Sequence, residues 1–226
     1  MRPFAPPKKQ HGQSELGRLG SRRLRREAQA TQVFPISDEQ LRPDFPASKV
    51  VKGLFEVVKR VFGMKVRERL GIDTWHPDVR FYDIFDADEN ELRGQSRPRP
   101  LRPRTQAGRR RTDVCLGRRA TVSRWFTAKL VAYLTCNFNG PVDGKPALFT
   151  HNEVVTLFHE FGHGIHHMLT RIDVAGVAGI NGVAWDAVEL PSQFLENWCW
   201  ESEALAFISG HYETGEPLPA SCWRRC

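Results

Sequence analysis

The sequence predicts a mainly α-helical fold that contains a few short β-strands. The clearest helical signal follows Thr150, which together with Glu153 forms a capping box, the side-chain pair that opens a helix. Behind it, apolar residues recur at helical spacing and form one stripe, made of Val154, Phe158, Phe161, Ile165 and Met168. A second pattern of this kind covers 49–62, whereas β-prone runs are short and few.

The first half of the chain is expected to contain two helices and a strand. Ser37, followed by Asp, Glu and Gln, is a helix-start signal. The helix over 49–62 carries an apolar face of Val51, Leu54, Val57, Val58 and Val61. Residues 79–88 predict a strand that ends in a turn, and the returning strand of this hairpin falls in an Arg- and Pro-rich segment. Because proline cannot donate to a sheet, the hairpin is expected to lose its partner.

The second half is expected to add one strand and two more helices around the helix after Thr150. The run over 131–138 is β-prone and ends at Asn-Gly-Pro. It is interpreted either as a buried core strand or as an edge that pairs with an extended peptide. Helices are expected over 186–200, with a kink at Pro191, and over 202–211.

The helix after Thr150 carries the pattern His-Glu-x-x-His. Residues four apart lie on one helix face, so His159 and His163 can hold one Zn²⁺ through their imidazole nitrogens. Glu160 follows the first ligand, where its carboxylate can reach a water on the metal. The pattern therefore predicts amide hydrolysis by water. The alternative is a helix whose histidines serve only the core or the surface.

A catalytic zinc usually takes three protein ligands and keeps one position open. The metzincin arrangement is excluded, because it needs glycine and histidine where this chain has His166 and Leu169. A carboxylate from a second helix is the other common solution, and spacing alone leaves the candidates open. They are Asp173, Asp186, Glu189 and Glu196.

Four segments carry a resemblance to a known family. They are His159–Met168, Val188–Gln193, Leu195–Trp198 and Gly210–Pro217. They resemble the M3 family of zinc oligopeptidases, which includes thimet oligopeptidase and dipeptidyl carboxypeptidase, and most of all its bacterial oligopeptidase A members. The resemblance covers about 34–93 and 113–220. The implied fold is a fragment of the helical M3 catalytic domain.

The resemblance implies a role for each site residue. Glu189 is the third zinc ligand, and Glu160 is the general base that takes a proton from water and returns it to the leaving amine. A supporting or structural role falls to His166, Asp186 and Glu196. The family's glycine-rich loop beside the substrate is matched by Gly176, Gly179 and Gly182, whose alternative is an ordinary flexible connection. The implied cofactor is one Zn²⁺ per chain, and the implied substrates are short peptides.

Charge is unevenly distributed along the chain. The formal net charge is +7, but three basic segments carry more than this, so the remaining residues are net negative. These segments are 1–33, 94–112 and 221–226, and each is predicted to be out of frame or disordered. Shifted by one base, codons for Ser221–Cys226 can encode Glu-Leu-Leu-Glu-Lys-Met, a helical continuation. Between them lie a partial catalytic domain over 34–93 and a zinc-binding core over 113–220.

The basic segments also raise an alternative function, a nucleic-acid-binding module that uses arginine. The resemblance opposes it, so no nucleic acid is expected as a partner. No membrane is expected either, because no run approaches the ~20 apolar residues that cross a bilayer. Five scattered cysteines without a Cys-x-x-Cys pair, and no apolar leader, predict a cytoplasmic protein. Family residues that bind peptide and stabilise its charged intermediate have no counterpart in the chain, so zinc binding without turnover is expected.

Overall fold

The computed structural model describes residues 37–73, 76, 79–86, 92–101, 113–117, 121–123, 126–127, 130–142, 144–172, 174–219 and 222. The predictions made for 1–33 and 102–112, for most of 221–226, and for Asp173 lie outside these residues. The chain has two compact units, and the one described below covers Asp38–Leu218.

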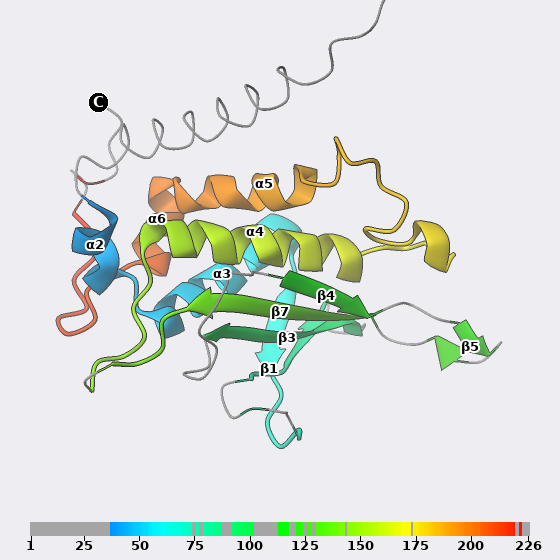
Figure 1. The fold of residues 1–226 in the computed structure, drawn as a ribbon, viewed down its shortest axis with the longest axis horizontal. Coiled ribbons are helices and arrows are strands. Elements are labelled where there is room, and N and C mark those ends of the chain that lie inside the picture. The colour runs from blue at the N-terminus through cyan, green and yellow to red at the C-terminus, as the bar shows by residue number, and fades with distance from the viewer. Residues whose placement is uncertain are drawn as a thin grey trace, which may run out of the picture. The chain divides into compact units, whose positions relative to one another are not determined.

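The helices described in this unit include one long helix of 18 residues. In chain order they are α2 (Asp38–Leu41), η1 (Arg42–Asp44), α3 (Ala47–Phe62), α4 (His151–Met168), η2 (Ala175–Val177), α5 (Leu190–Glu196), η3 (Asn197–Cys199) and α6 (Ser202–Ile208). Helix α4 lies between the sheet on one side and α5 on the other (Figure 1). The predicted mainly helical fold is confirmed.

The strands form one mixed sheet of five and a separate pair. The large sheet has the order β1-β2-β3-β7-β4, with β3 and β7 parallel and the other neighbours antiparallel. Its strands are β1 (Lys65–Glu68), β2 (Tyr82–Phe85), β3 (Leu92–Leu101), β4 (Asp113–Gly117) and β7 (Leu130–Phe138). The separate pair is β5 (Thr121–Ser123) with β6 (Phe126–Thr127).

Local sequence explains why α4 forms where it does. The capping box is present: Thr150 Oγ1 accepts from the Glu153 N–H at 3.1 Å, and Glu153 Oε2 accepts from the Thr150 N–H at 2.8 Å. All five residues of the predicted apolar stripe are buried, with at most 4% of their surface exposed. The stripe therefore fixes which face of α4 is left for chemistry.

Strand β7 packs against α4. Its alternate residues Ala132, Leu134, Cys136 and Phe138 are buried. A Cβ built on Gly164 of α4 would lie 3.6 Å from side-chain atoms of both Ala132 and Leu134, so helix and strand are in close contact. Because β7 pairs with β3 on one side and with β4 on the other as far as Thr135, the core-strand interpretation fits this part of the strand.

The expectation that the β2 hairpin loses its partner is wrong. Strand β2 pairs with β3, with Tyr82 opposite Ser96 and Ile84 opposite Gly94. The prolines do not prevent this, because Pro98 follows the last residue paired with β2 and Pro100 falls at an irregularity in the pairing with β7. Proline is tolerated where a strand has a free edge or a bulge.

The helix expected over 186–200 is shorter than predicted. Residues before Leu190 form turns, and α5 begins at Leu190 with Pro191 in its first turn. A proline at this place needs no hydrogen-bond donor, so Pro191 starts the helix instead of kinking it. The helices predicted near 49–62 and 202–211 are confirmed as α3 and α6.

Candidate metal centre

Helix α4 brings two imidazoles together on the face away from its apolar stripe. His159 and His163 are one turn apart, and their ring centroids lie 5.0 Å from each other with an interplanar angle of 86°. His163 is buried at 9% exposure, and the side chain of His159 is 22% exposed. Both rings can therefore present a nitrogen to one point without being fully open to water.

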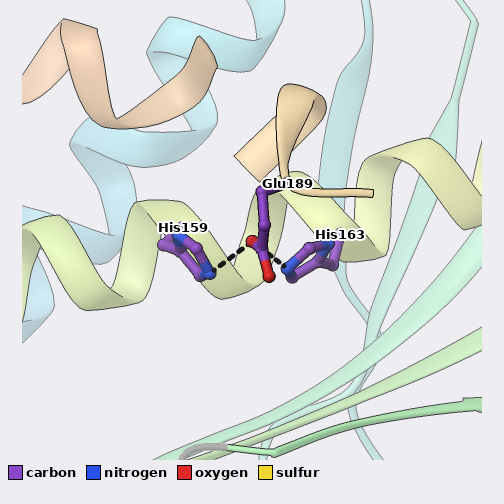
Figure 2. A group of neighbouring side chains, drawn as sticks. All are labelled: His159, His163 and Glu189. Atoms are coloured by element: carbon purple, nitrogen blue, oxygen red, sulfur yellow. Dashed lines mark ion pairs between the residues drawn. The ribbon is translucent and has the colours of Figure 1, made fainter. Parts of the chain in front are cut away.

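Glu189 places its carboxylate between the two rings, as Figure 2 shows. Its Oε2 lies 3.3 Å from His159 Nε2 and 3.2 Å from His163 Nε2. The three candidate ligand atoms all lie within 4.8 Å of one another. Two imidazole nitrogens and one carboxylate oxygen form a donor set that catalytic zinc takes in proteins. The residues present therefore fit the ion that the sequence pattern predicts.

Ser192 holds the Glu189 carboxylate from the first turn of α5. Its hydroxyl lies 2.8 Å from Glu189 Oε2 and 2.9 Å from the Glu189 carbonyl oxygen, so it can donate to either. Burial raises the pKa of Glu189, but the hydrogen bond from Ser192 and the nearby His163 and His159 outweigh it and lower that pKa overall. The lowered pKa favours the ionised carboxylate, which is the form that can bind a metal.

Glu196 orients His159 from the opposite side of the ring. His159 Nδ1 donates to Glu196 Oε1 at 2.6 Å, which leaves Nε2, the nitrogen facing Glu189, free to bind a metal. Burial lowers the pKa of His159, but the hydrogen bond and the charges of Glu196, Glu160 and Glu189 raise it overall. Among the described residues, Nδ1 of His163 has no hydrogen-bond partner, so the two imidazoles are supported unequally.

Glu160, the candidate general base, lies on the same helix with 9% of its surface exposed. Burial raises the pKa of the Cys136 thiol in β7, and the charge of Glu160 raises that pKa further. The same charge also raises the pKa of His159, against the effect of that ring's burial. Glu160 directly follows His159 in α4, so its side chain starts from the helical turn that carries the two histidines. Among the described residues, Glu160 does not belong to the group of three candidate ligands, and its role as general base stays a prediction.

Two other predicted site residues, His166 and Asp186, have different surroundings. His166 lines an apolar cavity of about 560 Å³ between α4 and α5, and burial and the charges of His163 and His167 lower its pKa. Asp186 is exposed in a turn and does not belong to the metal-binding group that the described residues form. Its supporting role stays a prediction.

The three loop glycines follow α4 and differ in their surroundings. Gly179 is buried at φ +61°, and a Cβ on it would lie 2.6 Å from His167 Nδ1, so this turn is packed on the end of α4. Gly182 also has a positive φ, of +76°, whereas Gly176 is exposed and has open space around it. At Gly179, at least, the loop is held against α4.

Two residues of the site were missed by sequence reasoning. Ser192 lies in the quoted Val188–Gln193 segment, and its position three residues after Glu189 is the one signal that could have identified it. Gly162 touches the start of α5, and nothing in the sequence marks it, because a glycine inside a helix predicts only lower helix stability.

The sequence matches the family described as Peptidase family M3 over residues 22–225. The chain belongs to this family. It is 64% identical over 195 residues to Oligopeptidase A of Escherichia coli (strain K12), and 61% identical over 193 residues to Oligopeptidase A of Haemophilus influenzae (strain ATCC 51907 / DSM 11121 / KW20 / Rd). Identity to the organellar oligopeptidase A of Arabidopsis thaliana is 42% over 195 residues.

These matches cover most of this chain but a small part of its relatives. Each of the two bacterial matches spans 85% of the chain and 28% of the relative. The family match also runs through 94–112, a wider span than the resemblance alone indicated. Among the described residues, no helix is both long and apolar enough to cross a bilayer.

Proposed function

We propose that this M3 segment binds one Zn²⁺ through His159, His163 and Glu189 and forms the zinc centre of a metallo-endopeptidase acting on short oligopeptides. The observation that carries the proposal is the position of Glu189 Oε2, 3.3 Å and 3.2 Å from the Nε2 atoms of the two histidines. Membership of peptidase family M3 supports peptide hydrolysis as the reaction.

The chain's own residues divide the chemistry between them. Zinc, when bound, supplies the Lewis acidity that makes a water molecule acidic near neutral pH. Glu160 takes the proton from that water and passes it to the leaving amine, a role that requires only a carboxylate close to the ligands. Glu196 keeps His159 in the tautomer that ligates, and Ser192 orients the Glu189 carboxylate. His166, Asp186 and the glycines remain supporting elements in the proposal.

Zinc binding and turnover are separate parts of the proposal. The chain spans 28% of the bacterial relatives, so we propose that it binds zinc while turnover by this segment alone is weak or absent. The nucleic-acid alternative is not carried forward, because the matched family is one of peptidases. The cytoplasmic location, and the assignment of 94–112 to a shifted reading frame, stay predictions.

Metal analysis and a peptide assay on the same preparation test the two parts. The purified chain should contain about one zinc per molecule, and His163→Ala should lose it. Any cleavage of a fluorogenic peptide should disappear with a chelator and in Glu160→Gln, which should retain zinc. A chain that binds no zinc above the level of His163→Ala would refute the zinc centre. Cleavage that persists in Glu160→Gln would refute the assigned base.

A further inference from the structure

Helix α5 comes very close to α4 at Gly162, the residue before the ligand His163. A Cβ built on Gly162 would lie 2.6 Å from Ser192 Cα, 2.7 Å from the Pro191 carbonyl oxygen and 3.0 Å from Ser192 N. All three are backbone atoms, which cannot move aside by changing a rotamer. Any side chain at 162 therefore has to displace the first turn of α5.

The displaced turn is the one that holds the third ligand. Ser192 is fully buried, and its hydroxyl reaches the Glu189 carboxylate at 2.8 Å. Pro191 lies between Ser192 and Glu189 in the chain, two residues after the ligand. The same residue that contacts Gly162 thus also fixes Glu189, so a shift at the contact is transmitted to the carboxylate.

The size of the shift exceeds what a zinc site tolerates. Ordinary carbon contacts begin at 3.4 Å, so Ser192 Cα, at 2.6 Å from the added Cβ, would have to retreat by about 0.8 Å. Ligand distances in a functional zinc site vary by only about 0.2 Å. Glu189 Oε2 lies at nearly equal distances from His159 and His163, and moving α5 outward would draw it away from both.

We propose that Gly162 is a positioning residue for the zinc centre: its missing side chain lets α5 bring Glu189 into contact with the two histidines. This inference rests on the proposed zinc site. It also explains a glycine in the middle of α4, where alanine would form the better helix. Gly162 contacts neither substrate nor metal and acts only through the path to Glu189.

The test measures zinc affinity for Gly162→Ala by competition with a chromophoric chelator, with Gly164→Ala as the matched control. Gly164 lies on the same helix, and a Cβ there would meet its neighbours at 3.6–3.7 Å, an ordinary contact distance. We expect Gly162→Ala to weaken zinc binding about 10- to 100-fold, as the loss of a supporting residue does. Gly164→Ala should leave zinc affinity within a factor of about three.

A double-mutant cycle with Glu189→Ala separates positioning from general damage. If Gly162 acts through Glu189, adding Gly162→Ala to Glu189→Ala should cause almost no further loss of zinc affinity. A further tenfold loss would overturn the proposal, as would a Gly162→Ala protein that binds zinc like the wild type. A wild-type chain that binds no zinc would instead refute the proposed function.

Ser192→Ala gives a second measurement in case Gly162→Ala fails to fold. This change removes the hydroxyl that holds Glu189 and adds no atoms at the contact. We expect zinc affinity to fall while the far-ultraviolet circular dichroism spectrum stays that of the wild type. Unchanged affinity in Ser192→Ala would break the path from Gly162 to Glu189 and overturn the proposal.

Discussion

Glu196 provides His159 with both a hydrogen-bond acceptor and a negative charge, and two substitutions separate these contributions. The bond from His159 Nδ1 to Glu196 Oε1 is short, at 2.6 Å, and the two side chains are only 22% and 18% exposed. Glu196→Ala removes the acceptor and the charge together. Glu196→Gln keeps an acceptor oxygen but removes the charge.

The expected losses follow from the nature of this bond. A hydrogen bond to a charged group contributes about 1.5–3 kcal/mol. Loss of a partner behind a zinc-ligating histidine weakens metal binding about 10- to 100-fold, or about 1.4–2.7 kcal/mol. The two estimates agree, so we expect Glu196→Ala to lose this much. A neutral acceptor gives about half the strength of a charged one, so Glu196→Gln should lose about three- to tenfold.

Zinc affinity measured by chelator competition checks both values. Glu203→Gln is the control, because Glu203 is exposed in the first turn of α6. It should bind zinc like the wild type. The reasoning is refuted if Glu196→Ala binds zinc normally, or if Glu196→Gln is the weaker binder of the two. Either result would mean that the orientation of His159 does not depend on Glu196.

Three further predictions concern pH, the cap of α4 and its core. Because neighbouring carboxylates raise the pKa of His159 despite its burial, the zinc-free protein should be stabilised below pH ~6.5 and lose this contribution as pH rises through the raised value. Zinc affinity should instead fall as the pH is lowered, because protonated His159 cannot bind the metal. Thermal unfolding with and without zinc between pH 5 and 8 measures both effects. Thr150→Ala should lower the free energy of unfolding by about 1 kcal/mol, since it removes the side chain that accepts from Glu153, and chemical denaturation measures this loss. Phe158→Ala, at a fully buried position of α4, should cost about 3–5 kcal/mol in the same experiment, and a loss below about 1 kcal/mol would contradict the placement of Phe158 in the core.

Helix α4 could be predicted from the sequence because its signals are local. The capping box at Thr150 and Glu153 lies within one turn, and the apolar stripe follows the period of the helix itself. The same reasoning positioned His159 and His163, whose spacing alone puts them on one face. A site built inside one helix is therefore open to prediction from spacing.

The third ligand could not be chosen in this way. Asp186, Glu189 and Glu196 recur at helical spacing, but the helix starts only at Leu190, so the three do not share a helix face. Asp186 is left in an exposed turn, whereas Glu189 and Glu196 reach opposite nitrogens of His159. The family resemblance favours Glu189 as the proposed third ligand because a family motif reflects a tertiary arrangement, which periodicity does not contain.

Strand β3 was mispredicted because the prolines were judged without their partners. A proline disrupts a strand only where a neighbour needs its missing donor, and that depends on where each ladder ends. The ladder with β2 ends at Ser96, before Pro98. Register between strands is a property of the folded chain, so composition alone could not decide the outcome.

Two buried cysteines, Cys136 and Cys199, allow local opening of the fold to be measured through the rate at which their thiols react. Cys136 lies in β7 beneath α4, and Cys199 lies in η3, where its carbonyl oxygen accepts from His151 Nε2 at 2.9 Å. Burial raises the pKa of both thiols, so neither reacts until its surroundings open. Labelling rates resolved by peptide mass therefore time the exposure of each thiol separately. If zinc lowers the labelling rate of Cys199 more than that of Cys136, the ion mainly stabilises the packing of α5 on α4. The native cysteines are sufficient for this measurement.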